Sequence, residues 1–138
     1  MTLSIKSIAS WSIVVLILMQ FVPLNRINPP VPSQIQIPYT IKSSLKKACY
    51  DCHSYETKWT QIAYIAPASW LACGIVSSGR TALNFSTLKK NETRAPLLTT
   101  KLRHTVKKGS AHQQLYYLLK PEAQLSIKET NAVLQWLN

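Results

Sequence analysis

One short run of the chain combines two thiols and an imidazole at close spacing: Cys49-Tyr50-Asp51-Cys52-His53. On a helical turn, the thiols of an i, i+3 pair lie on the same face, and the imidazole lies one position further on. Two thiols at this spacing can form thioether bonds to the two vinyl groups of a haem, and the histidine that follows them can bind the iron. The run therefore predicts one covalently attached haem c, held by Cys49 and Cys52, with His53 as the proximal iron ligand.

Three other kinds of site also use paired cysteines. A redox-active dithiol is typical of a thioredoxin-like alternation of strands and helices, which the sequence does not show. A structural zinc site usually has a second pair of ligands, whereas Cys73, His104 and His112 are isolated from one another. A structural disulfide between Cys49 and Cys52 is the third alternative. A non-haem thiol or zinc protein therefore stays open, and we interpret Cys73 as a small buried residue.

The elements that must position this motif are predicted to be helices. Ile41, Leu45, Ala48 and both motif cysteines follow the spacing of one helical face. We therefore expect a helix from about Thr40 through the motif, with the cysteines on its apolar face. Residues 54–64 are expected to form a loop around one haem edge.

Further helices are indicated along the rest of the chain. We expect them at 68–78, ended by Gly79, at 96–108, ended by Gly109, at 113–119, and after a capping box formed by Ser126 and Glu129. Gly74 is interpreted as a close approach of the backbone to the ring. No segment has the two-residue alternation of a strand, so the predicted fold class is all-α.

Helical periodicity also places His104. Leu98, Leu102 and Val106 repeat every four residues, and His104 lies on the other side of that helix. We therefore expect His104 to face solvent and not to bind iron.

Residues 1–24 predict a membrane anchor or a signal segment. The uncharged run from Ile8 to Leu24 is nearly long enough to cross a bilayer. No Ala-x-Ala-like cleavage site follows it, and Trp11 suits an interfacial position, so we prefer an uncleaved transmembrane helix. Residues 25–38 hold four prolines and predict an extended linker, which leaves 39–138 as the haem-binding domain. Thioether formation takes place outside the cytoplasmic membrane, so we expect this domain on the periplasmic or outer face of a bacterial inner membrane.

The chain of 138 residues carries a formal net charge of +11. It contains no basic-aromatic RNA motif and no DNA-reading unit, so we expect no nucleic-acid partner. Between residues 89 and 108, Glu92 is the only acid among many basic residues. Such a surface suits an acidic redox partner or anionic lipid, although a solvated helix face is an equal alternative. The basic residues are Lys89, Lys90, Arg94, Lys101, Arg103, Lys107 and Lys108.

Several ordered motifs resemble the small bacterial haem-binding domain family. The resemblance covers the chain from about Asn28 to the C-terminus, and it implies a membrane-anchored periplasmic domain with a cytochrome c-like helical fold and one covalent haem. The family's physiological role is poorly defined, so the resemblance implies a cofactor more than a pathway. The motifs are at residues 28–30, 48–54, 56–59, 64–71, 79–80, 83–86 and 117–123.

One segment departs from that family. Its members often carry a Gly-acidic-Met-Pro-Pro segment, whose methionine resembles a second axial ligand. Here the matching stretch is Gly109-Ser110-Ala111-His112, and the remaining methionines, at positions 1 and 19, lie in the N-terminal segment. His112 could replace the missing ligand, the sixth position could be open, or a Lys or Asn could bind. Loss of the methionine should lower the reduction potential.

These observations favour a membrane-tethered electron-transfer module that carries haem. The alternative is a haem-based sensor or binder of small ligands, which the missing methionine suggests. An enzyme such as a small peroxidase would need polar groups over the iron, for which only His112, Gln113 and Gln114 qualify, so we do not expect one.

Overall fold

The computed structural model describes residues 4–32, 36–88 and 96–137, and in these ranges it contains helices and no strand. The predicted all-α class is confirmed. In chain order the elements are α1 (Ile5–Met19), α2 (Tyr39–Ala48), α3 (Tyr50–His53), η1 (Gln61–Tyr64), α4 (Ala68–Ala82), α5 (Pro96–Lys108), α6 (Ala111–Leu119), η2 (Pro121–Ala123) and α7 (Ile127–Trp136), where η marks a 3-10 helix.

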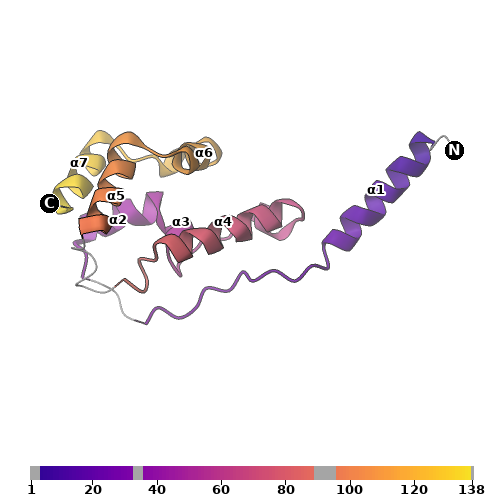
Figure 1. The fold of residues 1–138 in the computed structure, drawn as a ribbon, viewed down its shortest axis with the longest axis horizontal. Coiled ribbons are helices and arrows are strands. Elements are labelled where there is room, and N and C mark those ends of the chain that lie inside the picture. The colour runs from indigo at the N-terminus through magenta and orange to yellow at the C-terminus, as the bar shows by residue number, and fades with distance from the viewer. Residues whose placement is uncertain (1–3, 33–35, 89–95, 138) are drawn as a thin grey trace.

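The hydrophobic core lies where α7 packs against both α2 and α5 (Figure 1). It extends to α3 through Tyr50, whose ring stacks on that of Phe85 at 5.3 Å between centroids. The cysteine motif therefore starts at the edge of the core, and α3 in turn packs against α4. The buried members of this core are Ile41, Leu45, Tyr50, Phe85, Val133 and Leu137.

Two helix boundaries differ from the sequence prediction. The expected continuous helix through the motif is divided, because Cys49 takes φ −130° and ψ −33° between α2 and α3. The expected stop at Gly79 is also wrong, because α4 continues through it to Ala82. Gly109 does end α5, at a φ of 73° that favours glycine. The capping box of Ser126 and Glu129 is present at the start of α7.

The N-terminal helix α1 extends away from the other helices (Figure 1). Its 15 residues rise about 22 Å, whereas the hydrocarbon core of a bilayer is about 30 Å thick. Among the described residues, none of the helices combines the length and the apolar character needed to cross a membrane. The expected transmembrane helix is therefore not found as such: helical structure ends at Met19, before Pro23 restricts the backbone.

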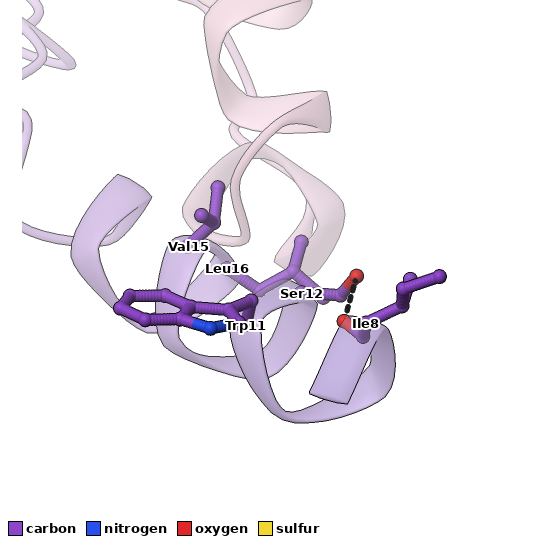
Figure 2. A pocket seen from close by; sticks show the side chains of 5 residues that line it. All are labelled: Ile8, Trp11, Ser12, Val15 and Leu16. Carbon is purple, nitrogen blue, oxygen red and sulfur yellow. Dashed lines mark hydrogen bonds between the residues drawn. The ribbon is translucent and has the colours of Figure 1, made fainter. Parts of the chain in front are cut away.

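Figure 2 shows a shallow hollow on α1, lined by side chains of this single helix. Its one polar side chain, Ser12, donates its hydroxyl hydrogen to the Ile8 carbonyl at 2.9 Å. The hollow therefore has no group that could do chemistry. It is lined by Ile8, Trp11, Ser12, Val15 and Leu16.

Candidate functional site

Local hydrogen bonds around Cys49 shape the motif. The Cys49 amide closes the last turn of α2 on the Leu45 carbonyl at 2.8 Å. The Cys49 carbonyl then accepts from the amides of Cys52, at 3.2 Å, and of His53, at 2.9 Å. These two hydrogen bonds form a single helical turn that contains Cys49, Cys52 and His53. All three cysteines of the chain are free thiols of intermediate exposure, and no disulfide joins Cys49 to Cys52.

The imidazole of His53 is oriented by a carbonyl from a distant segment. Its Nδ1 lies 3.0 Å from the carbonyl oxygen of Leu83, the residue that follows α4. A carbonyl only accepts hydrogen bonds, so Nδ1 carries the proton and Nε2 carries the lone pair of the neutral ring. The Phe85 amide donates to the His53 carbonyl at 2.8 Å and fixes the same two segments together. Metal-binding histidines are typically held through their second nitrogen in this way.

Gly79 allows α3 and α4 to approach closely. A Cβ atom at Gly79 would lie 2.4 Å from the carbonyl oxygen of Cys52 and 3.1 Å from the Cys52 Cβ. Only glycine fits this crossing, so the motif helix rests directly on the backbone of α4. Gly74, which we interpreted as a close approach of the backbone to the haem ring, has open space, because a Cβ atom there would meet nothing within 4 Å. That interpretation stays a prediction, and the close contact with the motif helix is made at Gly79.

Arg80 holds the loop that follows the motif. Its Nε donates to the Ser54 carbonyl at 2.8 Å, and one Nη donates to the Thr57 hydroxyl at 2.9 Å. The same nitrogen donates to the Asn28 side chain at 2.6 Å, and the other Nη reaches the Ile27 carbonyl at 3.2 Å. One guanidinium thus joins α4, the loop and the N-terminal linker. Sequence analysis noted this residue within the family motif but assigned it no role.

Asp51, between the two motif cysteines, connects α3 to α6. Its Oδ2 accepts from the Tyr116 hydroxyl at 2.7 Å and from the Lys120 ammonium at 2.6 Å. Its Oδ1 accepts from the amide of Lys58 at 3.2 Å. Burial and the hydrogen bond to Asp51 raise the pKa of Tyr116 above its ordinary value. Helix α6 packs against no described element except η2, so these side-chain bonds set its position over the motif.

Neither motif thiol is activated for redox chemistry. Burial, with a smaller contribution from Cys52, raises the pKa of Cys49 to about 12. Burial and the charge of Asp51 also raise the pKa of Cys52. Both thiols are therefore protonated near neutral pH, whereas redox-active Cys-x-x-Cys pairs have a lowered thiol pKa. The burial of these thiols and the charge beside them therefore argue against the dithiol alternative.

The zinc alternative finds no ligand set in the part of the chain that the structure describes. There, no three His, Cys, Asp or Glu side chains gather closely enough to hold one metal ion. Cys49, Cys52 and His53 are among the residues searched, so the motif does not form such a set.

A comparison with known proteins distinguishes haem binding from the dithiol and zinc alternatives. The chain matches the haem-binding domain family over residues 14–138. It belongs to this family. No curated protein and no solved structure matches it. Haem binding is therefore established at the level of the family, and the cysteine motif lies within the matched region.

The side chains around the motif of this haem-binding domain fit a haem. Within the described residues, the buried polar atoms that have no hydrogen-bond partner are Trp59 Nε1 and Gln113 Oε1, on the loop after α3 and on α6. Buried polar atoms normally find partners, and a haem carboxylate would accept a hydrogen bond from Trp59. Helices α4 and α6 also expose large apolar side chains that a porphyrin could cover. These are Leu71 and Ile75 on α4, and Leu115, Leu118 and Leu119 on α6.

The remaining predicted residues are placed as follows. His53 lies beside the two cysteines as expected. His112 belongs to α6 by its backbone, but its side chain lies outside the described part of the structure, so distal ligation stays a prediction. His104 is exposed on α5, as predicted. The sequence did not predict the roles of Leu83, Asp51 and Arg80, and the only available signal was their position inside the family motifs.

Proposed function

We propose that this haem-binding domain carries one covalent haem c and acts as an electron-transfer module. The observation that carries the proposal is the hydrogen bond from His53 Nδ1 to the Leu83 carbonyl. In the neutral ring this hydrogen bond leaves the lone pair on Nε2, the atom that would bind the iron, and the two thiols that would form thioether bonds lie in the same turn. When bound, haem supplies a one-electron iron couple. A cytochrome c-like arrangement of the helices is part of the same proposal.

Several residues of the chain would hold the haem, each by a different contact. The thiols of Cys49 and Cys52 would each add to one vinyl group: the S–H bond and the vinyl π bond break, a C–S and a C–H bond form, and no oxidant is consumed. His53 would bind the iron through Nε2, and Gly79 lets the motif helix pack closely on α4. Trp59 would donate its indole N–H to a haem carboxylate.

We also propose that residues 1–24 keep the domain at the bacterial inner membrane, facing the periplasm or the exterior. The support is that α1 exposes many large apolar side chains, among them Trp11, which is 66 % exposed. A basic face on α5, formed by Lys101, Lys107 and Lys108, suits an acidic redox partner. No described acid lies in α5 to offset it.

Binding of a small ligand to the iron is the second candidate. The observation that favours it is Ala111, which stands where family members often carry the methionine. If the sixth position is open, carbon monoxide should change the spectrum of the reduced protein. An unchanged spectrum would instead support a six-coordinate electron carrier.

Haem retention after denaturation tests the main proposal. The full chain is produced with a c-type maturation system and denatured, and we expect haem absorbance to stay with the protein. Cys49→Ser with Cys52→Ser should release or lack haem. Cys73→Ser is the matched control and should retain it, because Cys73 lies on α4 outside the motif. Haem that leaves the denatured wild-type chain would overturn covalent attachment.

A further inference from the structure

The 3-10 helix η1 exposes apolar side chains where the N-terminal helix meets the domain. Ile62, Tyr64 and Ile65 are 62 %, 56 % and 60 % exposed. Gln20, the residue after α1, accepts from the Ala66 amide at 3.0 Å and donates to the Ala66 carbonyl at 3.3 Å. Two hydrogen bonds to one backbone position hold this segment beside the end of α1, where Figure 1 also places the nearest part of the domain.

The charge around η1 is positive. The Arg26 guanidinium lies 4.7 Å from the centroid of the Tyr64 ring and donates to the Ala63 carbonyl at 3.4 Å. Between residues 57 and 88 the sequence contains no Asp or Glu. Cations and aromatic rings beside exposed apolar side chains, without acids, are the composition of a surface that rests in a bilayer interface.

Continuity with α1 favours lipid over a protein partner as the occupant. Phe21, directly after α1, is 78 % exposed next to the Gln20 contact. Exposed apolar side chains thus occur on α1, at Phe21 and on η1, and the Gln20 hydrogen bonds hold η1 beside the end of α1. A bilayer that takes up α1 would therefore meet η1 as well.

We propose that η1 is the lipid-contacting tip of the domain: Ile62, Tyr64 and Ile65 lie in the interface of the bilayer that binds α1. The inference rests on the proposed membrane tether and is independent of the haem. It orients the domain, because the tip, α4 and the Arg80 contacts to the linker form one connected path. The motif helix α3 lies at the other end of that path, directed away from the lipid.

Photo-crosslinking from lipid tests the tip. The full haem-loaded chain is placed in vesicles of phosphatidylcholine and phosphatidylglycerol at about three to one, a composition chosen for its anionic surface, with a diazirine lipid. After trypsin digestion, we expect crosslinks at Ile62 and Ile65 in the peptide 59–80, and none in the C-terminal peptide 129–138. Crosslinks in α1 but none in 59–80 would overturn the tip. A chain without crosslinks in α1 would overturn both tether and tip.

Paired variants locate the contact. Ile62→Asn with Ile65→Asn should lose the crosslinks in 59–80 and keep those in α1. Ile127→Asn is the matched control, because Ile127 is 83 % exposed on α7, and it should leave the pattern unchanged. Unchanged crosslinking in the double variant would overturn the assignment. Haem retention, measured on the same samples, reports failure of the proposed function separately.

Discussion

At the scale of residues, the geometry of the candidate haem site depends on partners that are remote in sequence. His53 is 30 positions from Leu83, whose carbonyl fixes the protonated nitrogen of the ring. Asp51 is 65 positions from Tyr116, whose hydroxyl donates a hydrogen bond to the Asp51 carboxylate. The motif supplies the reactive groups, whereas their orientation comes from atoms that the motif does not contain.

The crossing at Gly79 leads to a prediction about two glycines of one helix. Gly79→Ala would place a methyl group 2.4 Å from the Cys52 carbonyl oxygen, so it should lower the free energy of unfolding by about 1–3 kcal/mol. Gly74→Ala has open space in the same helix and should raise stability by about 0.5–1 kcal/mol. Chemical denaturation of both variants checks this. Equal effects at both positions would contradict the close crossing.

At the scale of elements, the motif helix is held from three directions. Helix α3 continues from α2, rests on α4 at Gly79, and is bonded to α6 through Asp51. Arg80 adds the linker to this assembly. A four-residue helix has little stability of its own, because nucleating the first turn costs more than it returns. Its shape therefore follows from its neighbours.

Helix α7 is tied to α2 through a titrating group. Glu129 accepts from the Ser126 amide at 2.7 Å and from the Lys47 ammonium at 2.9 Å. The Ser126 amide, followed by Lys47, lowers the pKa of Glu129 to about 2. Because the folded pKa lies below its ordinary value, the stabilisation is complete above pH 4.5 and is lost as the pH falls through about 2.

Glu129→Gln should therefore remove part of the acid dependence of stability. We expect the fall in unfolding free energy between pH 4.5 and about 2 to become shallower than in the wild type. Glu122→Gln, at an exposed position in η2, serves as the control and should leave the pH dependence of the unfolding free energy unchanged.

Ser126→Ala should lower the free energy of unfolding by about 1 kcal/mol at neutral pH, because it removes the side chain that caps α7. Denaturation curves at several pH values measure all three, and parallel curves for Glu129→Gln and wild type would exclude this role.

At the scale of the whole molecule, one core joins α2, α5 and α7 to the cysteine motif. Leu45 on α2 is 1 % exposed and lies in the same cluster as Tyr50 of α3 and Val133 of α7. The motif and the helical layer should therefore unfold together, as small single domains usually do.

Leu45→Ala tests that coupling. Truncation in a packed core costs about 2–5 kcal/mol, and we expect helix loss and the change in the haem spectrum to shift to the same lower midpoint. Ile127→Ala, exposed on α7, should stay within about 0.5 kcal/mol of wild type. Separate midpoints for the circular dichroism and haem signals would show that the site unfolds independently of the core.

The sequence by itself determined the all-α class, the capping box, the end of α5 at Gly109 and the Cys-x-x-Cys-His motif that is the candidate haem site. These features follow from local periodicity, from backbone restrictions and from residue chemistry within a few positions. The resemblance to the haem-binding domain family was visible for the same reason, because its motifs are short and ordered.

Only the tertiary structure decided the rest. It divided the motif helix at Cys49, carried α4 past Gly79, ended α1 at Met19 and assigned roles to Leu83, Asp51 and Arg80. Glycine has the same local signature whether it ends a helix or permits a crossing, and the choice at Gly79 depends on the Cys52 carbonyl that meets it. Contacts between segments far apart in sequence leave no periodic signal in the sequence. Only the folded structure therefore shows that the Leu83 carbonyl orients His53.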